Sequence, residues 1–441
     1  MPVTSFELML NTGQLAHVSR RRVVIIILFN RRPIEDVPFR RFMPRDVDVA
    51  NHGSSLSGKR ILLGITGGIA AVESVRLGRE LRRHGAELHV IMTEAATKVI
   101  TPLAVRWATQ APVDVEWSGE MPQLEGFDGI LVAPATRNTL SKHANGVMDS
   151  PLSMALAAAT GNQTPILVVP SMHDDLFDDP VTSDLIHRIE KRGCSILVSE
   201  SEEGRRKQPS PEDIVSRLSH ILNRDESSRS VLLVIGGTET PIDDVRVISN
   251  RSTGRTGWII ADYLYRKGHQ VCVLAGSLSF EPSTICFPII RSMDPVSMKC
   301  WVKDLIENEE MLIDSVVCAA AISDFVLSES HSGKIPSGDD AVLNLKPFEK
   351  ILDMIPNWLA SNGRENGQVI GFKLLSGSNE EELVNAARLQ IERSNVSAVV
   401  ANDLSQLDGD GPRALWVTAN DVEKLNDTNH IGVAIDGLLR A

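Results

Sequence analysis

A glycine-rich stretch between an apolar run and a periodic segment constrains this chain most. Residues 236–257 read G-G-T-E-T-P-I-D-D-V-R-V-I-S-N-R-S-T-G-R-T-G. The stretch follows Val231–Ile235, which predicts a buried strand, and precedes Trp258–Gly268, whose periodicity and final glycine predict a helix. A turn of this kind presents backbone N–H groups at a helix N-terminus, where the helix dipole favours an anion. The sequence therefore predicts a phosphate-binding site here.

The glycine spacing differs from that of two common phosphate-binding motifs. It matches neither the dinucleotide fingerprint G-x-G-x-x-G nor the P-loop G-x-x-x-x-G-K-[ST]. A dinucleotide-dependent oxidoreductase would also need an acidic residue after the second strand of the domain to bind the ribose, and Val271–Ser277 ends in Ala-Gly-Ser. The stretch is instead dense in polar side chains, which argues against an ordinary crossover loop: Thr238, Glu239, Asp243, Asp244, Arg246, Asn250, Ser252 and Thr253.

Both halves of the chain alternate apolar strands with periodic helices. At 441 residues the chain exceeds what one hydrophobic core usually serves, so two domains are expected. We predict an α/β protein with two doubly wound parallel sheets, flavodoxin-like or Rossmann-like, whose ligands bind at the carboxyl ends of the strands. The expected strands are 61–66, 87–92, 129–133, 165–169, 195–198, 231–235, 271–275, 315–321, 368–372 and 398–401, and the expected helices include 70–85, 180–193 and 258–268.

Composition separates an N-terminal extension from the two predicted domains. Residues 1–57 lack periodicity and mix arginine clusters with prolines, so we expect a disordered extension, or a true start at Met43. Residues 58–222 form the first predicted domain and residues 230–441 the second, with a polar linker between them.

Charge and cysteine usage narrow the class of protein. The net charge of −12 argues against a nucleic-acid partner. Five cysteines without zinc spacing fit buried thiols in a reducing compartment, so we expect a cytoplasmic protein. The apolar run Val23–Phe29 is too short to span a bilayer, so no membrane partner is expected.

The stretch 236–257 resembles the signature of phosphopantothenate–cysteine ligases, and the resemblance covers residues 231–410. It implies that the second half joins cysteine to 4'-phosphopantothenate through an acyl-nucleotidylate, using a nucleotide and Mg²⁺. Asn250 matches the family asparagine associated with turnover of this intermediate, and Lys334 matches the lysine of a mobile loop. Arg246 is suited to a carboxylate or phosphate because its planar fork binds such groups bidentately.

Small and acidic residues follow the later strands of the second half. Ala319 and Ala320 would let a nucleotide lie close to the backbone, and Asp324 could bind the ribose or the metal ion. Phe372 belongs to a Gly-Phe-Lys sequence at a later strand end. Bacterial members carry further lysines after the match to Lys334, and this chain does not. CTP is the expected co-substrate for a fused two-domain chain, with ATP possible.

A second series of motifs follows the strands of the first half. Gly67 and Gly68 allow the backbone to approach a phosphate closely, and three further strand ends read Met-Thr-Glu, Pro-Ala-Thr-Arg-Asn-Thr and Pro-Ser-Met-His. Together these motifs resemble the flavin-binding decarboxylases that remove CO2 from phosphopantothenoylcysteine, over the whole half. The resemblance implies that Asn138 contacts the substrate carboxylate and that the domain forms a homo-oligomer. It also implies an FMN site lined by Gly67, Gly68, Ile69, Thr93 and Thr139.

One position departs from the decarboxylase pattern. In that family FMN oxidises the cysteine thiol to a thioaldehyde, which stabilises the carbanion left by decarboxylation, and then returns the hydride. The family places a histidine ahead of the P-A-T-x-N-T loop, where this chain has Gln123. A glutamine cannot act as a general base, which leaves His173 as the alternative. Two interpretations stay open: an enzyme that performs both steps, and a ligase whose flavin domain binds FMN or regulates without turnover.

Overall fold

The computed structural model describes residues 45–282, 286–329, 332–336, 342–406 and 412–441. Most of the predicted extension, up to residue 44, therefore lies outside the described residues. Residues 45–48 form a turn of their own, in which Asp48 Oδ2 accepts a hydrogen bond from the Arg45 N–H at 2.8 Å. Leu56, inside the predicted extension, is fully buried in the core of the first domain.

The first domain is built on a parallel sheet in the order β3-β2-β1-β4-β5-β7. Its strands are β1 (Arg60–Ile65), β2 (Glu87–Met92), β3 (Val113–Asp114), β4 (Gly129–Ala135), β5 (Ile166–Pro170) and β7 (Cys194–Ile196). Its helices are η1 (Ile69–Glu73), α1 (Ser74–Arg83), α2 (Glu94–Thr97), α3 (Pro102–Thr109), η2 (Pro122–Leu124), α4 (Arg137–Asn145), α5 (Pro151–Gly161), α6 (Asp174–Phe177), α7 (Pro180–Glu190) and α8 (Pro211–Asn223).

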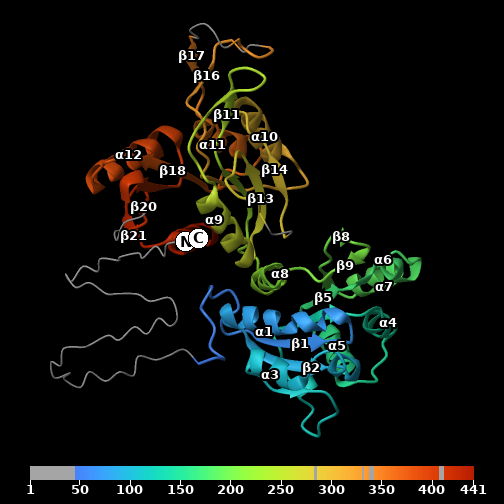
Figure 1. Cartoon of the computed structure of the whole chain (residues 1–441). Coiled ribbons are helices and arrows are strands. Elements are labelled where there is room, and N and C mark those ends of the chain that lie inside the picture. Colours follow the sequence, from blue (N-terminus) through green and yellow to red (C-terminus); the bar gives the residue numbers. More distant parts are fainter. Residues whose placement is uncertain (1–44, 283–285, 330–331, 337–341, 407–411) are drawn as a thin grey trace, which may run out of the picture. The chain divides into compact units, whose positions relative to one another are not determined.

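Helices cover both faces of this sheet because successive side chains of a strand point to opposite sides. Ile61 and Leu63 of β1 pack with α1, α3 and α8, whereas Leu62 packs with α4, α5 and α7. A short antiparallel sheet of β6 (Met172–His173), β9 (Arg205–Arg206) and β8 (Ser201–Glu202) lies beyond β5 in the chain. Figure 1 shows β1 and β2 beside α1, α3 and α5.

The second domain is an eight-stranded sheet in the order β14-β13-β10-β15-β18-β19-β20-β21. Its strands are β10 (Ser230–Ile235), β13 (Gln270–Ala275), β14 (Ile289–Arg291), β15 (Ser315–Cys318), β18 (Val369–Leu375), β19 (Ala398–Asp403), β20 (Ala414–Val417) and β21 (Val422–Leu425). Its helices are α9 (Arg255–Arg266), α10 (Pro295–Glu307), α11 (Ile351–Ser361), α12 (Glu380–Ser394), the short η3 (Leu404–Gln406) and α13 (Thr428–Arg440). Two small hairpins, β11 (Glu239–Pro241) with β12 (Val247–Ser249) and β16 (Phe325–Leu327) with β17 (Leu345–Pro347), complete it.

The predicted fold class is confirmed: both sheets are doubly wound and start from a central strand. Two details differ from the sequence prediction. The helix expected over 70–85 begins as the 3-10 helix η1 before α1. The second sheet also continues past β19 into β20 and β21, which pair antiparallel. These two edge strands were not predicted, because they are short and contain polar residues.

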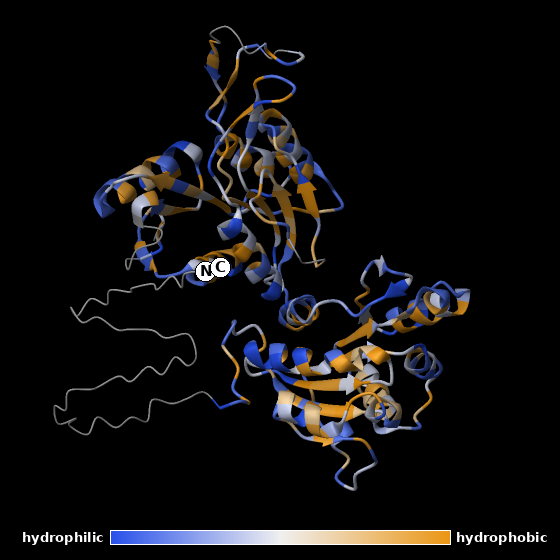
Figure 2. Cartoon of the chain, viewed as in Figure 1, coloured by the Kyte–Doolittle hydropathy of each residue, from blue (hydrophilic) through white to orange (hydrophobic). Residues whose placement is uncertain are grey.

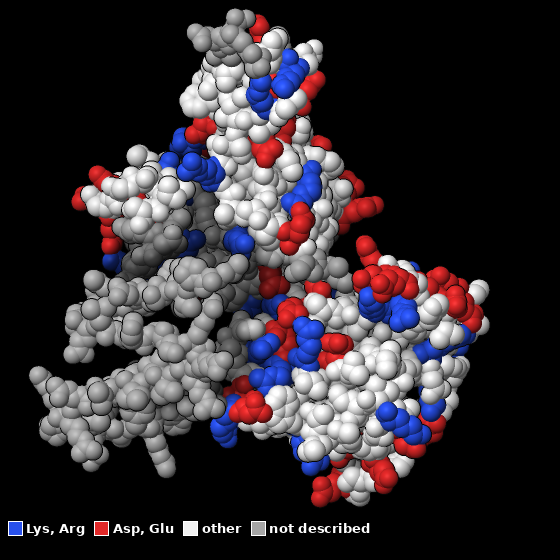
Figure 3. Space-filling model, viewed as in Figure 1, with Lys and Arg blue, Asp and Glu red and all other residues white. Residues whose placement is uncertain are grey.

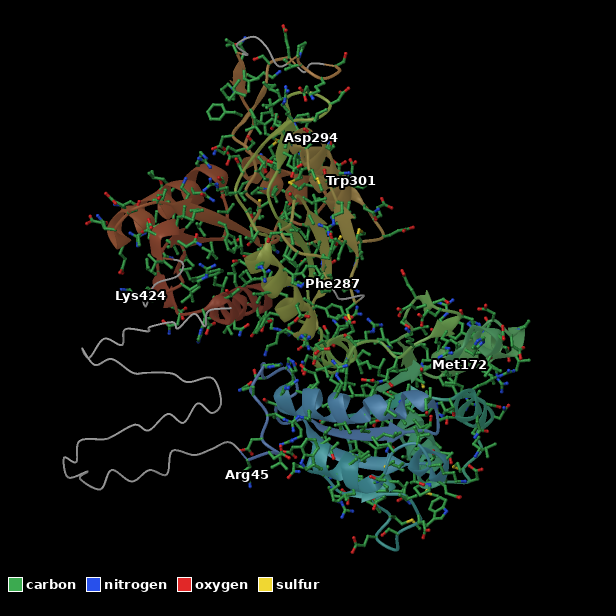
Figure 4. The ribbon with its side chains drawn as sticks, in the orientation of Figure 1. Arg45, Met172, Phe287, Asp294, Trp301 and Lys424 are labelled. Carbon is green, nitrogen blue, oxygen red and sulfur yellow. The ribbon has the colours of Figure 1, made fainter. Side chains whose placement is uncertain are left out.

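Local sequence explains where the helices begin. Asp294 caps α10 by accepting a hydrogen bond from the Ser297 N–H at 2.8 Å, and Pro295 follows at the first helical position (Figure 4). Figure 2 shows the apolar residues concentrated in the strands of both sheets, as expected for strands buried on both faces. Within the described residues, every helix is too short or too polar to cross a bilayer.

Candidate functional site

The predicted phosphate turn is formed where β10 meets α9. Gly236 has φ +85°, and a Cβ there would lie 2.7 Å from the Ser277 carbonyl oxygen, so the turn requires glycine. Gly257 in the first turn of α9 lies against β10, because a Cβ on it would approach Ile235 Cγ2 to 2.4 Å. The start of α9 is therefore held directly over the end of the central strand.

A cavity of about 780 Å³ opens at this point. It is lined by residues in or just after the carboxyl-terminal parts of β15, β18 and β19, and by the start of α9. Of the residues predicted for the second half, the cavity brings together Asn250, Ala319, Ala320, Asp324 and Phe372. This location agrees with the rule that ligands of such sheets bind at the carboxyl ends of the strands.

Asn250 is fixed by bonds to two neighbouring segments. Its Nδ2 donates to the Ala321 carbonyl oxygen at 3.1 Å, and its backbone N–H donates to the Thr238 carbonyl oxygen at 3.3 Å. Thr238 Oγ1 in turn accepts from the Ser323 N–H at 2.8 Å. Within the described part of the chain, Oδ1 of Asn250 has no hydrogen-bond donor, so it remains available to a ligand.

Asp324 lies at the rim of the cavity and forms an ion pair with Lys350, whose Nζ is 2.6 Å from Asp324 Oδ1. Its side chain is 59% exposed, so the carboxylate can reach an incoming ligand. Phe372 is the central residue of β18 and lines the cavity together with Lys373.

Arg246 and Lys334 do not line this cavity. Arg246 Nη1 instead lies 3.0 Å from Asp243 Oδ2 and 3.3 Å from the Ile335 carbonyl oxygen. The Ile335 N–H donates to the same Asp243 carboxylate at 3.0 Å, and the Gly333 N–H donates to Asp244 Oδ2 at 2.9 Å. The two aspartates thus hold the backbone on either side of Lys334.

The Asp243 carboxylate is buried, and burial alone would raise its pKa. Hydrogen bonds from the backbone N–H groups of Val245, Ile335 and Arg246, with the charge of Arg246, outweigh burial and lower the pKa below its ordinary value. The pair of Asp243 and Arg246 is therefore a structural connection between the β11–β12 hairpin and the Lys334 loop.

Another cavity, of about 730 Å³, lies at the carboxyl ends of the first sheet. We call it the first cavity, after its domain, and the cavity at the start of α9 the second cavity. Of the predicted residues, Gly67, Thr93, Asn138 and Thr139 line it. Thr93 also caps α2, because its Oγ1 accepts a hydrogen bond from the Ala96 N–H at 3.3 Å. A Cβ on Gly67 would lie 2.4 Å from Ala95 Cβ, so the backbone there approaches α2 as closely as glycine allows.

Three other predicted residues lie outside the lining of this cavity. Gly68 faces Thr136 and Pro134, and Ile69 begins η1 with 80% of its surface exposed. His173 lies on β6 next to Met172, which Figure 4 labels, and caps α6 by accepting from the Asp175 N–H at 3.3 Å.

Gln123 is buried, with only 3% of its surface exposed. Its Nε2 lies 3.0 Å from Met121 Sδ and 3.7 Å from Met154 Sδ, in contact with α5, and the residue does not line the cavity. The structure therefore gives Gln123 a packing position and no place among the residues that face a ligand.

Several cavity residues were not predicted from the sequence. Lys142 Nζ lies 2.7 Å from Asp149 Oδ2, and both line the first cavity. His143 is buried on α4, and its Nε2 lies 3.3 Å from Cys194 Sγ. Burial and the charge of Arg192 lower the pKa of His143 to about 4, and burial raises the pKa of Cys194 to about 11, so both groups are neutral near pH 7. The sequence offered one signal for His143, its position five residues after Asn138.

The second cavity is also lined by basic residues that were not predicted, namely Arg251, Lys350, Arg393 and Arg413, and by Lys373 of the Gly-Phe-Lys sequence. No group of three or more histidine, cysteine, aspartate or glutamate side chains suited to a metal ion occurs among the described residues. Of the predicted residues, Asp324 is therefore the single carboxylate that the cavity at the start of α9 offers to a metal ion.

Comparison with known proteins gives two family matches. The model for Flavoprotein matches residues 49–223, and the model for the DNA/pantothenate metabolism flavoprotein C-terminal domain matches residues 227–435.

Two archaeal proteins resemble nearly the whole chain. A protein of Thermococcus kodakarensis named coenzyme A biosynthesis bifunctional protein CoaBC is 37% identical over 386 residues, which cover 85% of this chain and 93% of the relative. A protein of the same name from Methanocaldococcus jannaschii is 32% identical over 378 residues, covering 84% and 90%. The solved structure of the DNA/pantothenate metabolism flavoprotein of Streptococcus pneumoniae is 25% identical and has a TM-score of 0.41, covering 47% of this chain and 96% of that one.

Proposed function

This chain belongs to the family of coenzyme A biosynthesis bifunctional proteins, and from that premise we propose how its two cavities divide the work. The chain is an enzyme of coenzyme A biosynthesis with a ligase half and a decarboxylase half. We assign ligation of cysteine to 4'-phosphopantothenate to the cavity at the start of α9, with CTP as co-substrate. We assign decarboxylation of 4'-phosphopantothenoylcysteine, with FMN, to the cavity of the first sheet.

The observation that carries the ligase assignment is the fixed amide of Asn250 beside the free start of α9. In the first step a carboxylate oxygen of 4'-phosphopantothenate attacks the α-phosphorus of the nucleotide, and the bond to pyrophosphate breaks. In the second step the amine of cysteine attacks the acyl carbon, loses a proton, and the nucleoside monophosphate leaves. Both steps build negative charge on oxygen, which positioned donors and cations stabilise.

Asn250 supports this sequence because its amide is bifunctional. Nδ2 donates one hydrogen bond to the Ala321 carbonyl and can donate a second to an acyl oxygen nearby, while Oδ1 can accept a hydrogen bond from the N–H of the incoming amine. Ala319 and Ala320 carry only methyl side chains, so the nucleotide can lie against the backbone of the strand end. Lys334 approaches from a loop whose backbone is held by Asp243 and Asp244, and we propose that its ammonium meets a phosphate.

Mg²⁺ fits the ligase cavity as a partner of the nucleotide. This ion usually takes one or two carboxylates and completes its shell with phosphate oxygens and water. Asp324 offers one partly exposed carboxylate at the rim, which matches that need without a protein cage. When bound there, Mg²⁺ would neutralise phosphate charge. The Asp324 carboxylate would then either break its ion pair with Lys350 or bind Lys350 and the metal ion through different oxygens.

The assignment is tested by incubating the full chain with 4'-phosphopantothenate, cysteine, Mg²⁺ and either CTP or ATP. We expect 4'-phosphopantothenoylcysteine, pyrophosphate and nucleoside monophosphate, identified by mass, with CTP the better co-substrate. Absence of all three products with either nucleotide contradicts the ligase assignment. Equal or greater rates with ATP contradict only the choice of CTP.

FMN fits the cavity of the first sheet. Gly67 leaves the backbone open at the end of β1, and hydroxyl groups of Thr93, Thr136, Thr139 and Ser150 line the cavity. When bound, FMN supplies reversible hydride transfer with the carbon that bears the thiol. The chain's own residues orient the substrate: we propose that the amide of Asn138 binds its carboxylate and that Thr139 contacts the cofactor.

Decarboxylation also needs a base, which we assign from the positions of Gln123 and His173. Gln123 faces methionine sulfurs, so we propose that His173, exposed on β6, takes the substrate proton. His173→Asn should then lose CO2 release while the absorbance of bound FMN persists. Decarboxylation at the wild-type rate in this variant contradicts the role of His173, and bound flavin without CO2 release in the wild type supports a flavin domain without turnover.

We further propose that the first half self-associates. Ile69 is 80% exposed and Val72 is 49% exposed. Both belong to η1, which directly follows Gly67 and Gly68. A neighbouring subunit could cover these apolar side chains and the cofactor edge. A monomer in light scattering of the FMN-loaded chain contradicts this proposal.

A further inference from the structure

Thr66 connects two parts of the first cavity. It directly follows β1 and lines this cavity, although only 1% of its surface is exposed. Its hydroxyl donates a hydrogen bond to the Pro134 carbonyl oxygen at 2.8 Å and accepts one from the Thr136 N–H at 2.9 Å. Its backbone N–H also donates to the Pro134 carbonyl oxygen, at 3.3 Å. These hydrogen bonds join the end of β1 to the end of β4 and the start of α4.

The segment that Thr66 holds carries Asn138 and Thr139. Thr136 is the N-cap residue of α4, but within the described residues its hydroxyl caps no backbone N–H and lies 3.1 Å from Thr139 Oγ1. A side-chain cap commonly fixes the first turn of a helix. Here a hydroxyl from another strand fixes the Thr136 backbone instead. Because Asn138 lies in the first turn of α4, a shift of Thr136 would move the Asn138 amide.

The backbone of Thr66 also closes the glycine turn after β1. The Gly68 N–H donates to the Thr66 carbonyl oxygen at 2.9 Å, so this bond does not involve the hydroxyl. Replacing the hydroxyl by a methyl group would keep the turn bond and leave the buried Thr136 N–H contact without its acceptor, which is unfavourable. The Thr66 hydroxyl is therefore specific to the α4 side of the cavity.

We propose that Thr66 is a positioning residue of the decarboxylase half, whose hydroxyl sets the place of the Asn138 amide in the first cavity. The inference rests on the proposed roles of Asn138 and FMN. Thr66 acts through the start of α4 and not by contact with the substrate. Such an indirect effect can be large, since misplacement of a substrate-binding group by about 1 Å can cost about 10²-fold in rate.

Thr66→Val tests the inference, because valine has nearly the same shape and lacks the hydroxyl. In the FMN-loaded full chain, kcat for CO2 release should fall about 10²-fold, while the absorbance of bound FMN persists. Thr66→Ser keeps the hydroxyl and should retain most of the wild-type rate. The matched control is Thr109→Val, at a buried threonine of α3 whose hydroxyl donates to the Val105 carbonyl oxygen at 2.8 Å. It should leave kcat unchanged.

Hydrogen exchange provides a readout that does not depend on turnover. The Thr136 N–H loses its acceptor in Thr66→Val, so amides at the start of α4 should exchange faster than in the wild type, with or without FMN. Amides of α3 should be as protected as before. Unchanged protection at the start of α4 would show that the hydroxyl does not hold this segment, and would overturn the inference.

A double variant separates positioning from an independent effect. In Asn138→Ala the amide that Thr66 positions is already absent, so adding Thr66→Val should lower kcat no further. Substrate with a labelled carboxylate makes slow CO2 release measurable in these variants. If Thr66→Val lowers kcat as much in the Asn138→Ala background as in the wild type, Thr66 acts independently of Asn138 and the inference is overturned.

The remaining outcomes separate the inference from the function on which it rests. If the wild type binds FMN but releases no CO2, the decarboxylase assignment fails and the inference fails with it. If the wild type releases CO2 and Thr66→Val does so at the same rate, the inference alone is overturned. The temperature of unfolding of each variant shows whether the fold is retained. An unfolded Thr66→Val beside a fully active Thr66→Ser would assign the hydroxyl to stability and likewise overturn the inference.

Discussion

The two cavities lie at the same end of the same kind of sheet, yet their charges are opposite. The cavity of the first sheet is lined by three acidic residues and one lysine, namely Glu94, Glu116, Asp149 and Lys142. The cavity at the start of α9 is lined by five basic residues, Arg251, Lys350, Lys373, Arg393 and Arg413, and by two acidic ones, Asp324 and Glu349. On the visible face in Figure 3 basic and acidic side chains are intermixed.

The contrast shows that the fold fixes the place of the cavity, whereas the side chains decide its charge. A doubly wound sheet places a ligand at its carboxyl ends, but it does not select the ligand's charge. The one lysine of the first cavity, Lys142, is paired with Asp149, so hydroxyl and backbone groups are the main donors that this cavity offers to a phosphate group. The second cavity offers cations that would neutralise the triphosphate of the ligase reaction that we propose.

The largest expected effect comes from Asn250→Asp, which should act on the second cavity alone. The variant loses the donor to an acyl oxygen and places a carboxylate against the Ala321 carbonyl oxygen. Removal of one such donor typically costs about 10² to 10³ in rate, so ligation should fall by that factor. Product formation measured by mass, with CO2 release from supplied 4'-phosphopantothenoylcysteine unchanged, would show that the two cavities work independently.

Asn385→Asp, at an exposed position on α12, makes the same chemical change away from both cavities and should leave ligation intact. An active Asn250→Asp variant would remove Asn250 from the mechanism. It would not affect the contrast in charge between the two cavities.

The next effect is a pH dependence that distinguishes the first cavity from the second. His143 lines it with a pKa lowered from 6.5 to about 4, so the folded state stays neutral where the unfolded state takes up a proton. Its stabilising contribution is fully present above pH 6.5 and is lost as the pH falls toward 4, by about 3 kcal/mol in total. No histidine is among the described residues that line the second cavity.

Hydrogen exchange of the α4 and β4 amides in the full chain, at pH 7 and pH 5, measures this dependence. His143→Gln should flatten it, whereas His187→Gln, on the exposed side of α7, should not. If protection in His143→Gln still declines with falling pH as in the wild type, another group is responsible.

A matched pair of glycine substitutions should disturb one cavity each. Gly67→Ala would place a Cβ 2.4 Å from Ala95 Cβ, and Gly257→Ala would place one 2.4 Å from Ile235 Cγ2. Overpacking of this kind costs about 1 to 3 kcal/mol and moves the backbone that faces the ligand. We expect Gly67→Ala to weaken FMN binding only and Gly257→Ala to weaken nucleotide binding only, as measured by absorbance and calorimetry.

Gly126→Ala and Gly437→Ala are the controls, since a Cβ at either position meets no atom within 4 Å. Loss of both ligands in either test variant would mean that the two cavities are coupled through the fold.

The smallest expected effect is a difference in salt dependence. The exposed Arg251 and the partly exposed Lys373 attract the triphosphate over distances that salt screens, so raising ionic strength from about 50 to about 200 mM should weaken CTP binding by a factor of about 2 to 5. FMN binding, which lacks cations beyond the paired Lys142, should change less. If CTP and FMN affinities fell equally with rising salt, the proposed difference in charge between the two cavities would be contradicted.

The sequence by itself determined the two doubly wound sheets and the strand ends at which the two cavities lie. It did so because apolar runs, glycine turns and helix starts are local features, and strand ends of a parallel sheet must share one edge. For this reason Asn250, Asp324 and Phe372 share one cavity, and Gly67, Asn138 and Thr139 share the other, as the order of the motifs implied.

Only the tertiary structure decided which polar side chains are free to act. Arg246 lies in the predicted stretch, but its guanidinium donates a hydrogen bond to Asp243. The amide of Gln123 faces two methionine sulfurs. Arg413 carries no motif and reaches α9 only because β20 pairs antiparallel with β19. The physical reason is that a side chain's partners depend on strand pairing and loop packing between residues far apart in the sequence, which no local pattern records.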